Sequence, residues 1–183
     1  MIVNVSTKNK TKKAAIIMAT HFYAGLLMGS RLSSVLMIDV DLIKNLDIDD
    51  GINGGATWDD TNDRGSDFTI RLDADMPIAD TLRILAHEMV HVKQYAKGEM
   101  MEYMAAPDLV KWQGKKTDFA EIDYWDYPWE IEAYGRELGL YIRFTEMLKI
   151  ENNAWHYIKN VVRCIYNEKT ERVREMLELD IIE

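Results

Sequence analysis

Two histidines four residues apart, with a glutamate directly after the first, constrain this chain more than any other feature. They stand in the segment His87-Glu88-Met89-Val90-His91, inside an apolar run from Leu82 to Val92. Residues four apart lie on one face of a helix, so both imidazoles can reach a single ion. This spacing suits a tetrahedral Zn²⁺. Glu88 lies on the flank of the same face, where its carboxylate can take a proton from a water bound to the ion.

The residues around the motif favour a helix that packs against a core. Pro77 precedes it and is typical of a first turn, and Gly98 predicts its end. The histidines flank an apolar stripe, at the edge of the face that should be buried. The stripe has a helical period and consists of Ile78, Leu82, Leu85, Met89 and Val92. The alternative is an accidental match, in which an amphipathic helix carries two surface histidines.

A hydrolytic zinc centre needs a third protein ligand and keeps its fourth position open for water. The other histidines are His21 and His156, and Cys164 is the single cysteine. Few nitrogen or sulfur donors are therefore left, and we expect the third ligand to be a carboxylate.

The best carboxylate candidates are Glu130 and Glu132. They belong to a segment that begins at Pro128 and predicts a helix to about Lys149. Because they are two residues apart, they cannot share one face of that helix. One of them should point into the site and the other away from it.

The H-E-x-x-H motif, followed some tens of residues later by a helical E-x-x-A, resembles the gluzincin metallopeptidases. Among these, the small minigluzincin-like proteins look most similar. In their pattern the ligand is the Glu three residues before the small residue, which in Glu130-Ile131-Glu132-Ala133 selects Glu130. Glu132 stays the alternative. The resemblance implies a zinc metallopeptidase that cleaves a peptide or protein substrate, with one Zn²⁺ per chain held by His87, His91 and Glu130 and with Glu88 as the catalytic base.

The chain departs from the gluzincin pattern at one position. Many gluzincins carry an Asp four residues after the ligand, where it supports a histidine. Tyr134 stands there in this chain, and its hydroxyl takes either a related role or none. We assign no residue to stabilising an oxyanion, since Tyr127, Tyr134, Arg136 and His156 are all candidates.

Composition narrows the class of protein. A length of 183 residues predicts one domain, 1–183, with a sizeable core. The net charge of −9 argues against nucleic acid as the main partner, because phosphate binding needs a basic face. No apolar stretch is long enough to span a bilayer unbroken, so we expect no membrane partner. The single cysteine excludes an internal disulfide and fits a cytoplasmic protein. The sequence does not determine the oligomeric state.

The order of predicted elements is that of an α+β protein. An N-terminal helix and a small mixed β-sheet pack on the H-E-x-x-H helix, and a helical C-terminal half follows. This zincin-like order is similar to the minigluzincin core. The first helix is expected at Lys12–Met28, although the lysines before it also resemble the start of a signal peptide. Strands are expected at Val35–Val40, Ala56–Trp58 and Asp67–Leu72, an irregular aromatic segment at 99–126, and further helices near 153–166 and 168–179.

Several features carry open alternatives. In the resembling families the strand before the motif helix forms the rim of the cleft and has an edge to which a peptide can pair. Asp67–Leu72 is the matching segment here, and the alternative is an ordinary sheet strand with no free edge. The acidic segments Asp47–Gly51 and Asp59–Asp63 lack a full Ca²⁺-loop spacing and read as solvated turns. An aromatic group either lines a substrate pocket or packs a long loop: Trp112, Tyr124, Trp125, Tyr127 and Trp129.

Two other functions compete with the peptidase. The chain is either a metal-stabilised binding or regulatory module with little proteolytic activity, or a helical interaction protein without metal. A plugged fourth position on the zinc would favour the first of these, and a lack of bound zinc would favour the second.

Overall fold

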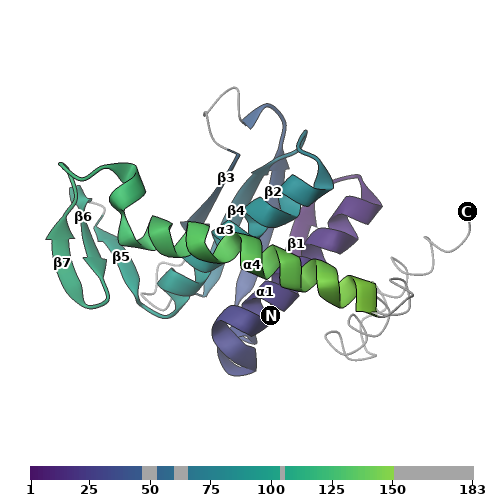
Figure 1. Ribbon diagram of the computed structural model, residues 1–183, viewed down its shortest axis with the longest axis horizontal. Helices are drawn as coiled ribbons and strands as arrows, with labels where there is room; N and C mark the ends of the chain where they lie inside the picture. Colours follow the sequence, from purple (N-terminus) through teal and green to yellow (C-terminus); the bar gives the residue numbers. More distant parts are fainter. Residues whose placement is uncertain (47–52, 60–65, 104–105, 151–183) are drawn as a thin grey trace, which may run out of the picture. The chain divides into compact units, whose positions relative to one another are not determined.

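The computed structural model describes residues 1–46, 53–59, 66–103 and 106–150 (Figure 1). The chain divides into two compact units, Met1–Ile142 and Arg143–Glu183, and the account below concerns the first. Of the second unit, the described residues are 143–150, the last turns of helix α4 (Pro128–Ile150). The helices expected near 153–166 and 168–179, and His156 and Cys164 with them, lie outside the described residues, as does most of both acidic segments.

A four-stranded mixed sheet forms the first half of this unit, as the α+β expectation requires. Its order is β1-β2-β4-β3, from β1 (Ile2–Ser6), β2 (Met37–Ile43), β4 (Asp67–Asp73) and β3 (Gly54–Trp58). The first three strands run parallel and β3 runs antiparallel to β4. Strand β1 was not predicted, because its two buried valines, Val3 and Val5, give too short an alternation to stand out.

The strand pairing decides between the two alternatives for Asp67–Leu72, which is an ordinary strand inside the sheet. Asp67–Leu72 does not border the cleft with a free edge, because β4 lies between β2 and β3 and pairs with both. The outer position belongs to β3, the strand before it in the chain. Sequence alternation identifies a strand but does not reveal its neighbours, so the sequence could not decide whether Asp67–Leu72 has a free edge.

Helices α1 (Lys10–Ser33) and α3 (Ile78–Ala96) pack on each other and on the sheet. The expected helix Lys12–Met28 is therefore present and longer, with a break at Gly29, whose φ is 73°. The Tyr23 hydroxyl donates to the carbonyl of Leu82 at 3.1 Å, which joins α1 to α3 inside the core. One face of the sheet supplies the rest of this core: Val3, Val5, Ile38, Val40, Phe68, Ile70 and Leu72.

The side chain of Lys12 connects α1 to the segment that precedes α3. Its Nζ donates to the carbonyls of Ala74 and Met76, both at 2.9 Å. Pro77 then occupies the N-cap position of α3, and Gly98 follows the end of that helix with φ 66°. Both ends of the motif helix therefore lie where the sequence predicts them.

Residues 99–126 are not irregular, as was expected, but contain a three-stranded antiparallel sheet. Its strands are β5 (Met100–Tyr103), β6 (Ala106–Trp112) and β7 (Lys115–Asp118). Gln113 and Gly114, both with positive φ, form the turn between β6 and β7. The short, polar strand β7 lacks the alternation of apolar and polar residues by which a strand is predicted from sequence. This sheet buries a second cluster beside the first turn of α4: Met100, Val110, Phe119 and Trp129.

Helix α4 begins at Pro128, after the 3₁₀ turn η1 (Tyr124–Asp126), and so has the predicted start. Among the described residues, no helix combines the length and apolarity that a membrane crossing requires.

Candidate metal centre and pocket

Helix α3 carries the motif on a buried face. Leu82, Leu85, Met89 and Val92 are buried as the helical period predicts, whereas Ile78 in the first turn is exposed. The histidines stay close to the surface of this core, with 7% of His87 and 8% of His91 exposed. Burial of a polar ring costs free energy unless each nitrogen has a partner. The partners of the four ring nitrogens therefore indicate which ligand the site can hold.

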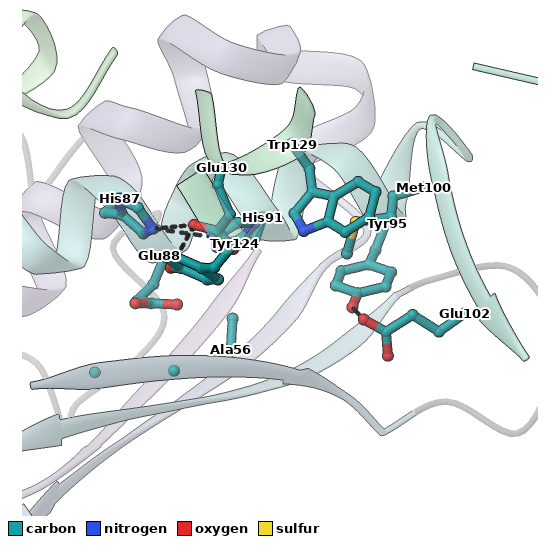
Figure 2. Close-up of a pocket in the computed structure, with 12 residues that line it drawn as sticks. Ala56, His87, Glu88, His91, Tyr95, Met100, Glu102, Tyr124, Trp129 and Glu130 are labelled. Carbon is teal, nitrogen blue, oxygen red and sulfur yellow. Dashed lines mark hydrogen bonds and ion pairs between the residues drawn. The ribbon is translucent and has the colours of Figure 1, made fainter. Parts of the chain in front are cut away.

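Three side chains converge on one point: His87 and His91 from α3 and Glu130 from the first turn of α4 (Figure 2). The two Nε2 atoms lie 3.1 Å apart. Glu130 Oε2 lies 3.3 Å from Nε2 of His87, and Oε1 lies 3.5 Å from Nε2 of His91. Glu130, the residue that the gluzincin pattern selects, thus lies beside both histidines.

These separations fit a tetrahedral zinc ion. Ligand atoms placed about 2.0–2.1 Å from a tetrahedral centre are separated from one another by about 3.3 Å. The three measured distances, 3.1, 3.3 and 3.5 Å, lie around that value. Two imidazoles and a carboxylate are also the donor set of many catalytic zinc sites. The residues present therefore fit the ion that the resemblance implies.

The outer nitrogen of each histidine has a partner that orients the ring. His87 Nδ1 lies 3.1 Å from Oε2 of Glu137, and His91 Nδ1 lies 2.9 Å from Oε1 of Gln94. Both oxygens are acceptors, so each Nδ1 carries the proton and donates it. The Gln94 orientation is fixed, since its Nε2 donates to the carbonyl of Trp129 at 3.0 Å. In the neutral form that binds a metal, each histidine then presents an unprotonated Nε2 to the cluster.

The ionisable side chains of the cluster shift one another's pKa values. Burial works to raise the pKa of Glu130, but hydrogen bonds from His87, His91 and Tyr124 outweigh it and hold that pKa far below the usual range. Burial likewise works to lower the pKa of His91, but the bond with Glu130 and the charge of Glu88 outweigh it and raise that pKa. The protein's own groups thus make this a place where positive charge is stabilised.

Glu132 points away from the cluster, as one of the two glutamates had to. Its Oε1 lies 2.7 Å from Nζ of Lys93 and 2.8 Å from Nε of Arg136, and its Oε2 accepts from Gln94 at 3.1 Å. These bonds outweigh burial and lower the pKa of Glu132. Glu132 is thus an ion-pair partner inside the helix pair, and Arg136 is engaged with it.

Glu88 is buried beside the cluster, with 5% of its surface exposed. Burial raises the pKa of its carboxyl above the usual value, although the histidine charges and a hydrogen bond from the Ala56 backbone oppose the rise. A carboxyl whose pKa is raised toward neutrality can both accept and return a proton. The absence of a side chain at Gly54 lets strand β3 lie close to Glu88 and Ile84 of α3. A Cβ at this position would lie 3.1 Å from Glu88 Oε1 and 2.7 Å from Ile84 Cγ2.

A pocket of about 200 Å³ opens beside these residues. Strand β3 borders it along its outer edge, while the cluster and Glu88 form one end (Figure 2). The lining residues are Gly54, Gly55, Ala56, His87, Glu88, His91, Tyr95, Met100, Glu102, Tyr124, Trp129 and Glu130. The open position that a hydrolytic centre needs is therefore available next to the three donors.

The aromatic residues before α4 divide between the two roles considered for them. Tyr124 lines the pocket and donates to Glu130 Oε2 at 2.8 Å, and Trp129 also lines it. Trp112 and Tyr127 instead pack around the second cluster, and Trp125 is exposed. The segment thus contributes both to the wall of the pocket and to packing.

Tyr134 does not take the place of the gluzincin Asp. Its ring lies edge-on to His87, with centroids 4.5 Å apart, while Glu137 holds the Nδ1 atom of that histidine. His21 lies in α1 and does not belong to the metal-ligand group. Neither Glu137 nor Gln94 was predicted, although Gln94 lies three residues after His91 and Glu137 seven after Glu130, spacings that keep a helical face.

Comparison with known protein families, curated proteins and solved structures gave no match.

Proposed function

We propose that this chain is a zinc-dependent metallopeptidase of gluzincin type with a zincin-like fold. The carrying observation is the convergence of His87, His91 and Glu130 at separations that suit a tetrahedral ion, with Glu88 buried beside them at an open pocket. The order of the elements supports it: a first helix, a sheet with an antiparallel edge strand, the motif helix and the Glu130 helix.

Zinc, when bound by these three residues, supplies a Lewis acid that activates water and polarises a carbonyl. Glu88 accepts the proton of the attacking water and later passes it to the leaving amine. Its burial and raised pKa suit this exchange, since the carboxyl must be neutral for part of the cycle. Glu137 and Gln94 keep the two imidazoles oriented throughout.

Strand β3 offers the means to hold an extended peptide. The amide of Asp59 donates to Asp67 of β4, and the carbonyl of Asn53 accepts from Asp73. Backbone groups alternate along a strand, so those of Gly54, Ala56 and Trp58 face away from β4, and of these the Ala56 amide already donates to Glu88. Within the described residues, no other strand pairs with this edge. A substrate can therefore add as a further strand beside Glu88.

The open pocket favours an enzyme over a metal-stabilised binding module. A module that only binds has no need of a buried carboxyl beside an accessible metal position, whereas hydrolysis needs both. Glu88 meets that need and serves no ion pair with lysine or arginine among the described residues.

Zinc content and peptide cleavage, measured together, test the proposal. The wild-type protein should bind one zinc per chain and cleave members of a mixed peptide library, followed by mass spectrometry. Glu88→Gln should keep the zinc and lose about 10²–10⁴-fold in rate, as expected for loss of a general base. Glu121→Gln, at an exposed carboxylate outside the pocket, is the control. Lack of zinc after reconstitution overturns the proposal, and zinc without any cleavage favours the binding module.

A further inference from the structure

The end of the pocket that lies away from the metal cluster has a distinct chemistry. Figure 2 places Trp129, Met100, Tyr95 and Glu102 on the side of Glu130 away from His87. Met100 and Trp129 are buried members of the second apolar cluster, so their positions are fixed by packing. This end thus combines a rigid apolar wall with one carboxylate.

The Glu102 carboxylate is held in place by Tyr95. The Tyr95 hydroxyl donates to Oε1 of Glu102 at 2.9 Å. The Tyr95 ring itself packs near the rings of Trp58 and Phe68, with centroid distances of 6.2 and 6.4 Å. Glu102 is exposed, and among the described residues its second oxygen, Oε2, has neither a hydrogen bond nor an ion pair. One oxygen is therefore oriented by the protein and the other is available to a ligand.

The charge of the pocket leaves Glu102 uncompensated. Its charged lining residues are Glu88, Glu102 and Glu130, and no lysine or arginine lines it in the described part of the chain. A bound Zn²⁺ balances Glu130 and Glu88, which lie at its own end of the pocket. The single charge of Glu102 then remains, beside apolar and aromatic surface.

We propose that this end of the pocket receives a lysine or arginine side chain of the substrate, next to the bond that is cleaved. The aliphatic stem packs on Met100 and Trp129, and the cationic group meets Oε2 of Glu102 and the Tyr95 ring. This assignment rests on the proposed peptidase function. It makes Glu102 the residue that determines specificity and Tyr95 the residue that positions it.

The size of the pocket agrees with a single side chain. Its volume of about 200 Å³ is below the roughly 300 Å³ at which small-molecule sites begin. The rest of an extended peptide would lie along β3, outside this space.

Peptide binding to the zinc-loaded Glu88→Gln protein tests the assignment without turnover. Alanine-based hexapeptides carry one lysine, or one norleucine of similar length, at each position in turn, and fluorescence anisotropy of a labelled terminus gives each Kd. At one position lysine should bind about two- to fivefold more tightly than norleucine, as expected for an ion pair with an exposed carboxylate. The preference should shrink as salt is raised.

Variants then assign the preference to its residues. Adding Glu102→Gln should abolish the lysine preference, and Glu102→Lys should replace it by a preference for glutamate at the same position. Tyr95→Phe, which keeps the ring packing, should reduce the preference in part. Glu121→Gln removes the same charge at an exposed position outside the pocket and should change nothing.

The outcomes separate this inference from the function beneath it. Equal binding of lysine and norleucine peptides, or a lysine preference that survives Glu102→Gln, overturns the specificity assignment alone if the wild-type protein binds zinc and cleaves peptides. Absence of zinc overturns the proposed function, and the substrate assignment with it.

Discussion

Glu137 lies seven residues beyond Glu130 on helix α4, and its Oε2 is 3.1 Å from Nδ1 of His87. Helix α4 thus provides one candidate metal ligand, Glu130, and two turns later the residue that orients a second candidate ligand, His87. Oε1 of Glu137 lies 4.0 Å from the Arg83 guanidinium, so the support is itself held by charge. Such outer partners fix the orientation of a ligating imidazole and increase its basicity.

Replacing Glu137 by alanine should therefore weaken zinc binding. We expect the affinity to fall about 10–100-fold, because His87 loses the acceptor that orients its ring. Glu137→Gln keeps an acceptor oxygen and should lose less. Competition with a chromophoric chelator measures both. Equal affinity in Glu137→Ala and wild type would show that the His87 ring needs no such support.

The two glutamates of the first turn of α4 should behave oppositely. Glu130→Ala removes a donor from the cluster and should abolish stable zinc binding. Glu132→Ala should keep one zinc per chain but lower the free energy of unfolding by about 1–3 kcal/mol, since Lys93 is buried and loses one of its partners. Elemental analysis and urea unfolding in chelator check the pair. Loss of zinc in Glu132→Ala but not in Glu130→Ala would reverse the ligand assignment.

A methyl group added at Gly54 should disturb both the fold and the site. Its Cβ would lie 2.7 Å from Ile84 Cγ2 and 3.1 Å from Glu88 Oε1, so either strand β3 or the side chains of Ile84 and Glu88 must move. We expect Gly54→Ala to cost about 1–3 kcal/mol of stability and to slow cleavage. Gly25→Ala, in α1 with open space around its Cβ, should instead stabilise by up to about 1 kcal/mol. Thermal unfolding and peptide turnover of both variants decide this.

The motif helix was predictable because its information is local. The prediction rested on the spacing of His87 and His91, the apolar stripe and Gly98. All of these lie within or directly after one helix, so the sequence alone is enough to predict it. The choice between Glu130 and Glu132 could not be made from helix geometry, which only separates them, and rested on the gluzincin pattern. The ligand role itself remains a prediction that the zinc measurements test.

The supports of the site depend on contacts between elements. Glu137 reaches His87 only because α3 and α4 meet at a particular angle and height, which no periodicity encodes. Gln94 lies on α3 itself, three residues after His91, and depends on α4 only for the bond to the Trp129 carbonyl that fixes its orientation. The edge position of β3 likewise follows from the pairing order of the whole sheet. Sheet β5–β7 was missed for a different reason, since its polar strand β7 lacks the alternation that marks a half-buried strand.

Acid should destabilise the protein through His21 in α1. Burial, together with the charge of the N-terminal amino group, lowers the pKa of His21 from 6.5 to about 4. Between these pH values the unfolded state binds a proton that the folded state does not, so stability falls as pH drops from 6.5 toward 4. In His21→Asn, the loss in free energy of unfolding between pH 6.5 and pH 4 should be smaller by on the order of 2 kcal/mol. Urea unfolding in chelator across this range measures it, and parallel curves for the two proteins would contradict the assignment.

The two hydrogen bonds of Lys12 link helix α1 to the residues directly before helix α3. Lys12 Nζ fastens the carbonyls of Ala74 and Met76, directly before the helix that carries His87 and His91. Neutralising this amine by acetylation, or shortening the chain past it, would loosen the start of that helix without touching a single pocket residue. Such a change would reach His87 and His91 only through the packing of α1 against α3.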